Sequence, residues 1–372
     1  MRDAERRAWA VVKQAYEERS PAPTRARPRL LVPALVAAVA VGVAAIATPP
    51  GHAVFKKVRE AVGVQQAEPA LFSLPSSGRL LVVSNKHGGV WLIHDNGLKR
   101  RIGSSEDELG SPHGLFVVAT TKNALVTLDI ENGVDIRWSL SRRGAFWPRW
   151  EGTRFDTRIA YLTPAGLRIV AGDGTGDHLL DRRAGAVPPA WDPVLLHTIA
   201  YFADGAIVLR ETDSGRIVWR HALAFTPAAL AWSSDGRFLA AASGHKVDVL
   251  DANGKTHRTV TTLAADLIDA AFKPHSHQLA LSLRTTIGSE VRVVDIDRPG
   301  RGQLLFAGPG SFGSIAWSPD GDWLLVGWPT ADQWLFLHGS RVRAVANIKE
   351  QFPRSDQQGP SLQFDSRWCC AR

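Results

Sequence analysis

The sequence of 372 residues contains only two cysteines and a single methionine. Cys369 and Cys370 are adjacent, so they cannot join distant segments of one chain by a disulfide. For this pair we keep four alternatives: a vicinal disulfide, pairing between molecules, free thiols, or a structural place in a terminal strand. No cysteine lies near the apolar segment at residues 30–47, which excludes a lipoprotein anchor there.

The sequence also lacks the short motifs that mark several classes of enzyme. It has no Walker loop, no H-E-x-x-H motif and no G-x-S-x-G nucleophile elbow. The nearest stretch to an elbow, residues 308–314 (GPGSFGS), has Pro309 where the first glycine belongs. We therefore expect no catalytic residue and no cofactor, and we predict that the protein is not an enzyme. An envelope enzyme is kept as a minor alternative.

Two groups of polar residues resemble metal sites only superficially. Asp173, Thr175 and Asp177 alternate like the start of a calcium loop, but the glycine and the distal acidic ligand are missing. His275 and His277 flank one serine, and no third ligand is suggested nearby. The remaining histidines show no common spacing. A solvated hairpin and a surface turn are the favoured interpretations, and no metal site is predicted.

Charge is concentrated at the start of the chain. Residues 1–29 carry eight basic and four acidic side chains, which supplies half of the formal net charge of +8. The remainder is nearly balanced, so no nucleic-acid partner is expected. The basic residues are instead typical of the cytoplasmic side of a membrane segment.

The longest apolar run follows this tail directly. Residues 30–47 read LLVPALVAAVAVGVAAIA, without a charge. A helix of this length spans roughly 27 Å, about the thickness of a hydrocarbon core. We predict a transmembrane helix over 30–48, with the N-terminus cytoplasmic and the rest extracytoplasmic. A cleaved signal peptide is the rival interpretation, because Ala45 and Ala47 form an A-x-A site.

Residues 2–19 precede the apolar run and have a helical pattern of apolar groups. Trp9, Val12 and Tyr16 follow at i, i+3 and i+7, the spacing of side chains that contact a partner from one helix face. The alternative is that this helix lies on anionic lipid and only supports insertion.

The rest of the chain repeats itself with a period of about 41 residues. The clearest units begin AWSSDG at Ala231 and AWSPDG at Ala316. Each unit has an aromatic anchor, a polar turn, an apolar run, a loop and a second apolar run. The anchors are Trp150, Trp191, Trp232, Phe272 and Trp317.

Two further units are weaker: one at Gly110, which lacks the aromatic, and one at Phe72. The apolar runs are short and rich in β-branched residues, and helical segments of ten or more residues are absent. Four short strands per period predict the blades of an all-β propeller, with each anchor between adjacent blades. Seven blades are favoured. Six are the alternative, because the unit at 273–278 (KPHSHQ) also departs from the pattern.

The expected organisation has five parts: a basic cytosolic tail with a short amphipathic helix (1–29), a transmembrane helix (30–48), a linker (49–69), a propeller (70–348) and a tail that closes the ring by adding a strand to the first blade (349–372). Tryptophans crowd the last repeat, and core packing is favoured for most of them. Trp328 stands next to Pro329 in an expected loop and is the candidate for an exposed ligand platform.

The AWSPDG and AWSSDG turns resemble those of TolB-like and WD-repeat-like bacterial propellers. The resemblance covers residues 70–348, and it implies the fold rather than an activity. Residues 131–138 and 213–219 also resemble the Gly-then-Trp repeat of quinoprotein propellers, but without its Thr-Gly-Lys core. Trp138 and Trp219 are therefore expected to be inward residues beside hairpin turns, not part of a quinone site.

The expected function is that of a tethered, extracytoplasmic binding module for a protein or cell-envelope ligand. The layout of tail, single span and propeller is also similar to membrane proteins linked to sigma-factor regulation. That similarity implies the alternative of a transmembrane regulator, in which the N-terminal tail contacts a cytosolic sigma factor.

Overall fold

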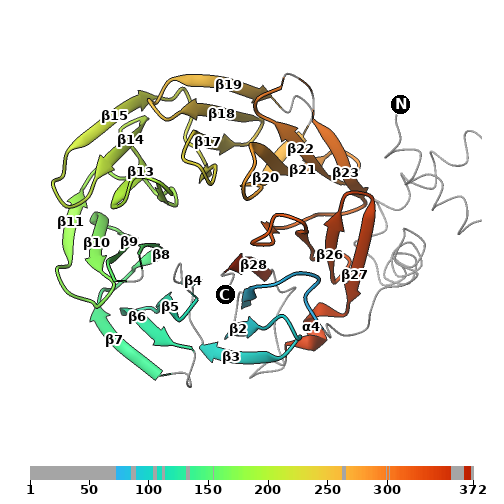
Figure 1. The fold of residues 1–372 in the computed structure, drawn as a ribbon, viewed down its shortest axis with the longest axis horizontal. Coiled ribbons are helices and arrows are strands. Elements are labelled where there is room, and N and C mark those ends of the chain that lie inside the picture. Colours follow the sequence, from blue (N-terminus) through green and yellow to red (C-terminus); the bar gives the residue numbers. More distant parts are fainter. Residues whose placement is uncertain are drawn as a thin grey trace, which may run out of the picture.

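The computed structural model is a ring of seven four-stranded antiparallel sheets, counted over the residues that it describes (Figure 1). The prediction of a propeller is confirmed, and the choice between six and seven blades is decided for seven. The described residues are 73–84, 89–103, 107–110, 114–130, 135–153, 155–261, 265–298, 300, 302–352 and 364–369.

The blades are numbered here in chain order, and the strands of each are given from the centre of the ring outwards. Blades 1 to 3 consist of β28 (Phe364–Cys369), β1 (Arg79–Ser84), β2 (Gly89–Ile93) and β3 (Lys99–Gly103); β4 (Asp107–Gly110), β5 (Phe116–Thr120), β6 (Ala124–Asp129) and β7 (Asp135–Ser141); and β8 (Phe146–Gly152), β9 (Thr157–Thr163), β10 (Gly166–Ala171) and β11 (His178–Asp181).

The other four blades follow the same order. Blades 4 to 7 consist of β12 (Ala190–Trp191), β13 (Thr198–Ala203), β14 (Ala206–Glu211) and β15 (Ile217–Ala222); β16 (Ala229–Trp232), β17 (Phe238–Ser243), β18 (Lys246–Asp251) and β19 (Thr256–Thr261); β20 (Ala265–Phe272), β21 (Gln278–Thr285), β22 (Ser289–Asp295) and β23 (Gln303–Gly308); and β24 (Ile315–Trp317), β25 (Leu324–Trp328), β26 (Gln333–His338) and β27 (Arg341–Ala346).

The second and third strands of each blade are apolar because a neighbouring blade covers each face of the sheet. All six residues of β13, for example, are buried. Each of the seven apolar clusters accordingly draws side chains from two adjacent blades. A strand that is buried on both faces reads as a continuous apolar run rather than an alternating one.

The anchor residues lie at the centre of the ring, on the first strands of blades 3 to 7. Each belongs to, or packs against, the apolar cluster that its own blade shares with the preceding one. The indole N–H of Trp191 also donates to the carbonyl of Arg149 in the preceding blade at 2.9 Å. Trp232 and Trp317 make the equivalent bond one blade back, at 3.2 and 3.1 Å. Phe272 has the same place without a donor.

In blades 5 and 7 the polar turn after the anchor is closed by its own serine. In blade 5, Ser233 Oγ donates to Asp235 at 2.7 Å and accepts the backbone N–H of Phe238 at 3.0 Å. The backbone of Gly236 has φ +70°, where a side chain would be strained. The Ser-x-Asp-Gly sequence therefore specifies this turn, and Ser318 arranges the turn of blade 7 in the same way.

The C-terminal segment supplies the inner strand of blade 1. β28 pairs antiparallel with β1 along its whole length, from Arg79 opposite Cys369 to Ser84 opposite Phe364. Trp368 is buried and donates its indole N–H to the carbonyl of Ser77 at 3.2 Å. The two ends of the described chain thus share one sheet. Cys370 lies outside the described residues.

The expectation for Trp328 is wrong. Its side chain is only 1% exposed, and its indole N–H donates to the carbonyl of Pro309 at 3.0 Å. The ring packs edge-on against Phe306 and Phe312. Position 328 is the last residue of β25 rather than part of a loop, so the ring turns into the interface between blades 6 and 7.

The helical predictions at the N-terminus fall on residues 1–72, which lie outside the described residues, together with the contact residues Trp9, Val12 and Tyr16. The part of the chain that is described contains no helix long and apolar enough to span a membrane. Its α-helix, α4 (Ile348–Gln351), follows the last blade and packs Phe352 against Trp91 of blade 1.

Candidate functional site at the seam of blades 3 and 4

Polar side chains converge on one face of the ring. In blades 2 to 7 the first strand is joined to the second on this side, and in all seven blades the third is joined to the fourth there, because successive antiparallel strands reverse direction. We call it the turn face. The connection between first and second strands is the inner turn, and the connection between third and fourth strands is the outer hairpin.

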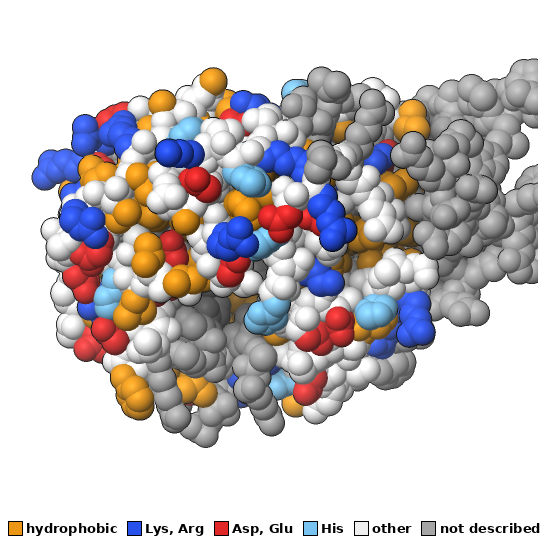
Figure 2. Space-filling view, turned by 45° about the horizontal axis from the view of Figure 1, so that its top comes forward, with side chains coloured by type: hydrophobic (Ala, Val, Ile, Leu, Met, Phe, Trp, Pro, Cys, Tyr) orange, Lys and Arg blue, Asp and Glu red, His pale blue; other side chains and the backbone are white. Residues whose placement is uncertain are grey.

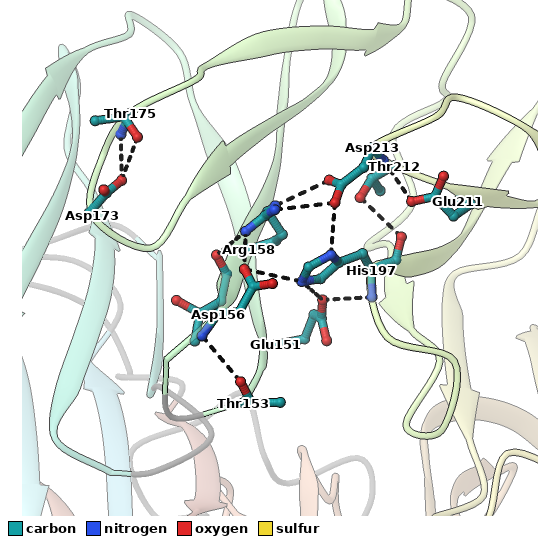
Figure 3. A network of polar contacts seen from close by, with 11 residues as sticks. Glu151, Thr153, Asp156, Arg158, Asp173, Thr175, His197, Glu211, Thr212 and Asp213 are labelled. Atoms are coloured by element: carbon teal, nitrogen blue, oxygen red, sulfur yellow. Dashed lines mark hydrogen bonds and ion pairs between the residues drawn. The ribbon is translucent and has the colours of Figure 1, made fainter.

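One such cluster lies where blades 3 and 4 meet (Figure 3). Glu151 is the last residue but one of β8, and Asp156 and Arg158 follow in the inner turn and at the start of β9. His197 ends the inner turn of blade 4, and Asp213 lies in that blade's outer hairpin. These five residues are called the seam cluster.

His197 is the centre of the seam cluster. Its Nδ1 lies 2.9 Å from Asp213 Oδ2, and its Nε2 lies 3.5 Å from Asp156 Oδ1 and 3.9 Å from Glu151 Oε1. The backbone N–H of His197 also donates to Glu151 Oε1 at 3.1 Å. The imidazole therefore connects carboxylates from two blades.

The backbone at His197 holds the ring in this position. Its φ is +56°, a left-handed conformation that is uncommon outside glycine. Its carbonyl accepts hydrogen bonds from both the N–H and the hydroxyl of Thr212, at 2.8 and 3.0 Å. The cost of the unusual φ is offset by contacts that fix both sides of the peptide.

Arg158 neutralises part of the negative charge. Its guanidinium donates two hydrogen bonds of 3.2 Å to Asp213 and one of 2.5 Å to Asp156. Burial would raise the pKa of Asp213, but the hydrogen bonds from Arg158 and His197 outweigh it and hold that pKa below the usual value.

Glu151 is in a different environment. Burial raises its pKa to about 7, against the opposing attraction of His197 and the hydrogen bond from that residue's backbone. The Nε2 atom of His197 is buried and has no hydrogen-bond partner among the described residues. The seam cluster therefore contains two unusual groups. The carboxyl of Glu151 gains or loses its proton near neutral pH, and the buried Nε2 of His197 has its nearest carboxylate oxygens 3.5 and 3.9 Å away.

A second histidine repeats this arrangement two blades further on. His277 Nδ1 lies 2.5 Å from Asp297 in the outer hairpin of its own blade, and Nε2 lies 2.8 Å from Asp235 in the preceding inner turn. Partial burial opposes a charged imidazole, but the two carboxylates outweigh it and raise the pKa of His277. The same pattern of contacts thus joins blades 3 and 4 and blades 5 and 6.

Other inner turns also touch their neighbours. Ser76, before β1, bonds to Asp320 of blade 7, and the backbone N–H of His275 donates to Ser234 of blade 5 at 2.9 Å. These contacts join the residues before β1 to the inner turn of blade 7, and the inner turn of blade 6 to that of blade 5.

The chemistry available to the seam cluster is that of holding and exchanging a proton. It contains acids, a base and a guanidinium, and the side chains that contact the imidazole of His197 are the carboxylates of Glu151, Asp156 and Asp213 rather than the hydroxyl or thiol of a nucleophile. Among the described residues, no group of three or more His, Cys, Asp or Glu side chains could hold a metal ion.

The residues that resemble a calcium loop have structural roles. Asp177 is buried and accepts hydrogen bonds from Arg168 at 2.6 Å, Tyr161 at 2.5 Å and Arg142. Asp173 accepts the N–H and hydroxyl of Thr175 at 2.9 and 2.7 Å, which closes the hairpin turn.

The two tryptophans that resemble a quinoprotein repeat clamp adjacent blades. Trp138 donates to the carbonyl of Gly172 at 2.9 Å, and Trp219 donates to the carbonyl of Ala252 at 3.0 Å. In each case the indole lies under the outer hairpin of the next blade, against Gly174 or Gly254.

The sequence did contain a signal for the seam cluster that the sequence analysis missed. His197 and His277 each stand directly before the second strand of their blade, and they are 80 residues apart, which is two repeat periods. Glu151 gave no such signal, because it belongs to the neighbouring blade, and Asp213 meets His197 only through the pairing of β13 with β14.

Comparison with known proteins supports the fold. No protein-family model matches the chain, and neither does any curated protein. Among solved structures, a putative 6-phosphogluconolactonase from Bacteroides uniformis is similar with a TM-score of 0.54 and 16% identity, over 78% of this chain and 100% of that one.

Two further structures are more distant. Hydrazine synthase of Kuenenia stuttgartiensis gives a TM-score of 0.49 at 16% identity, over 63% of this chain and 76% of that one. Sqt1 of Chaetomium thermophilum, solved with the N-terminus of a ribosomal protein bound, gives 0.48 at 19%, over 66% and 75%. The similarity to the Bacteroides uniformis structure supports the β-propeller fold and, at 16% identity, no activity.

Proposed function

We propose that the protein is a membrane-anchored, extracytoplasmic β-propeller that acts as a non-catalytic binding module for a protein or cell-envelope ligand. The observation that carries the proposal is that the polar side chains of the turn face contact one another. The acids and histidines that could do chemistry are engaged in contacts between blades, as at His197 and His277. The seven blades bring their loops together on two faces, an arrangement suited to recognition.

The proposed membrane anchor, residues 30–48, is supported by the sequence. The uncharged run at 30–47 is long enough for a hydrocarbon core, and the basic residues before it favour a cytoplasmic N-terminus. Cysteine labelling tests this topology. In a C369S/C370S background, Lys122→Cys places one thiol on an exposed turn of the propeller, and Arg19→Cys places one in the tail.

A membrane-impermeant maleimide added to intact cells should label Lys122→Cys and spare Arg19→Cys. Both should react after the membrane is permeabilised. If only Arg19→Cys is labelled in intact cells, the topology is the reverse of the one proposed. If neither variant is labelled before permeabilisation, the propeller lies inside the cell.

The second candidate function is that of a transmembrane regulator. It is favoured by the spacing of Trp9, Val12 and Tyr16, which would form one contact stripe on a helix of the cytosolic tail. A sigma factor is the partner proposed for this stripe. A pull-down from native membranes should compare the intact chain with the triple alanine variant at these positions. A cytosolic regulator captured only by the intact chain supports signalling, whereas identical envelope partners for both support the binding module alone.

A further inference from the structure

Exposed apolar side chains gather directly over the seam cluster. Phe155, in the inner turn of blade 3, is 94% exposed. Val194, Leu195 and Leu196, in the inner turn of blade 4, are 62%, 49% and 45% exposed. We call these four residues the apolar loops. Surface turns rarely expose three consecutive aliphatic residues and a phenylalanine to water. Exposed apolar patches of this kind mark interaction sites.

The apolar loops form one surface. Asp156 and His197, whose side chains are 3.5 Å apart, directly follow Phe155 and Leu196 in the chain. On the side of blade 5, Val194 lies against Gly236: a Cβ atom added to this glycine would be 3.0 Å from Val194 Cγ2. The patch therefore extends from blade 3 to the edge of blade 5.

The backbone of the longer loop is fixed. The buried carboxylate of Asp192 accepts the N–H groups of Val194 and Leu195, both at 2.8 Å. This carboxylate caps the turn, so its apolar side chains are held outwards by a specific arrangement. A rigid surface loses little conformational entropy when a partner binds.

Two half-exposed carboxylates border the patch. The side chains of Asp156 and Asp213 are 49% and 47% exposed, and both contact Arg158 and His197. About half of each carboxylate therefore remains open to solvent at the edge of the patch. A partner that brings a cation to this edge can bind there. Figure 2 shows hydrophobic, basic and acidic side chains intermingled on the face in view, where no charge of one sign dominates.

We propose that the apolar loops bind a protein segment that presents an aliphatic or aromatic side chain next to a lysine or arginine. The apolar side chain covers Phe155 and Leu195, and the cation pairs with the carboxylates of Asp156 and Asp213. This inference rests on the proposed role as a binding module, and it names the surface and the chemistry of the partner. An anionic membrane surface is disfavoured, because the same carboxylates would face its headgroups.

A peptide array tests the pairing of apolar and basic groups. Short peptides that carry Leu-Lys, Leu-Glu or Ser-Lys at the centre are probed with the full-length protein in lipid nanodiscs. The Leu-Lys peptides should be retained about tenfold more strongly than either of the other sets. Equal retention of the Leu-Lys and Leu-Glu peptides would overturn the role of the carboxylates.

Matched variants locate the binding surface. Phe155→Ser should weaken retention of the Leu-Lys peptides by about tenfold, because exposed anchors of this kind dominate small interfaces. Ile287→Ser is the control: it is 74% exposed in the connection between β21 and β22, on the opposite face, and should bind as the unchanged protein does. Asp156→Asn should reduce the ratio between retention of the Leu-Lys peptides and retention of the Leu-Glu peptides. Equal effects of Phe155→Ser and Ile287→Ser would overturn the proposal.

Photo-crosslinking identifies what covers the patch in native membranes. A crosslinking amino acid in place of Phe155 should yield an adduct with another protein, and the same group in place of Ile287 should not. Adducts with lipid, with a second copy or with residues 49–72 of the same chain would each overturn the proposed occupant. If envelope proteins are captured equally by the unchanged protein and by Phe155→Ser, the binding module stands and this surface for it fails. If neither form captures any, the proposed function fails as well.

Discussion

At the scale of single residues, the indole N–H groups of the inner strands connect the blades. Trp191, Trp232 and Trp317 each reach back to the carbonyl that precedes the anchor of the neighbouring blade. Phe272 has the same position with no donor, so packing alone suffices there. The hydrogen bond is therefore an addition to the apolar contact rather than its basis.

Replacement of Trp191 separates the two contributions. Trp191→Phe keeps an aromatic ring as at Phe272 and removes the bond to Arg149, so we expect a loss of about 1 kcal/mol in the free energy of unfolding. Trp191→Ala also removes the ring from between blades 3 and 4 and should cost about 3–5 kcal/mol. Urea unfolding of both variants measures the difference. Similar losses for the two would show that the N–H, not the ring, is what stabilises this interface.

Glu151 gives the protein a stability that depends on pH. Because burial raises its pKa to about 7, the folded state keeps a proton that the unfolded state releases from about pH 4.5 upwards. Stability should therefore fall as the pH rises through this window and level off above pH 7. Glu151→Gln retains an acceptor for the N–H of His197 and removes the titration.

At about pH 8 we expect the Glu151→Gln variant to be more stable than the unchanged protein by up to about 3 kcal/mol. Below about pH 4.5, where the Glu151 carboxyl is protonated in both the folded and the unfolded state, the two proteins should differ little in stability. Thermal unfolding across this range is the measurement. A variant that is less stable at the higher pH would show that the Glu151 carboxylate is favourably paired when charged, contrary to the effect of its burial.

The residues also show how far the sequence predicts this molecule. The anchors recur at a nearly constant spacing, so the propeller and its inner strands follow from a one-dimensional pattern. Trp328 was misjudged because a neighbouring proline suggested a loop, whereas β25 continues through position 328. The seam cluster could not be derived, since Glu151 meets His197 only after two blades are placed side by side, and Asp213 meets it only once β13 is paired with β14.

At the scale of elements, the outer hairpins of blades 3 and 5 each connect their blade to the preceding one. The turn Asp251–Gly254 lies over the indole of Trp219 from the preceding blade, and the hairpin at 171–177 covers Trp138 in the same way. A glycine is needed at each contact because the ring occupies the place of a side chain. The turns that close individual sheets thus also join neighbouring sheets.

Gly254→Ala tests this contact. Its Cβ would lie 2.6 Å from Trp219 Cδ2, and the φ of +76° is itself strained for alanine, so we expect a loss of about 2–4 kcal/mol in stability. Gly205→Ala is the matched control, since φ is +71° and nothing lies within 4 Å of its added Cβ. It should cost about 1 kcal/mol. Equal losses in chemical unfolding would mean that the indole moves aside freely.

At the scale of the whole molecule, the ring is closed where the two ends of the described chain meet. β28 gives blade 1 its inner strand, and Trp368 joins the apolar cluster shared by blades 7 and 1. A second connection lies outside it, where Phe352 after α4 packs against Trp91 and Gln351 accepts a hydrogen bond from Lys99 at 2.8 Å. Closure thus uses contacts at both the centre and the rim.

Removal of residues 364–372 should open the ring. β1 would lose its inner partner, and the side chains of Leu80 and Val82, which are fully buried between blades 1 and 7, would be left at an unpaired sheet edge. We expect broad unfolding in place of one cooperative transition, together with aggregation. Removal of 370–372 alone keeps β28 whole and is the control, with unfolding close to that of the intact chain. If the longer deletion unfolds as sharply and at the same temperature, the contacts of α4 and Phe352 suffice to hold blades 7 and 1 together, and the C-terminal strand is free to serve another purpose.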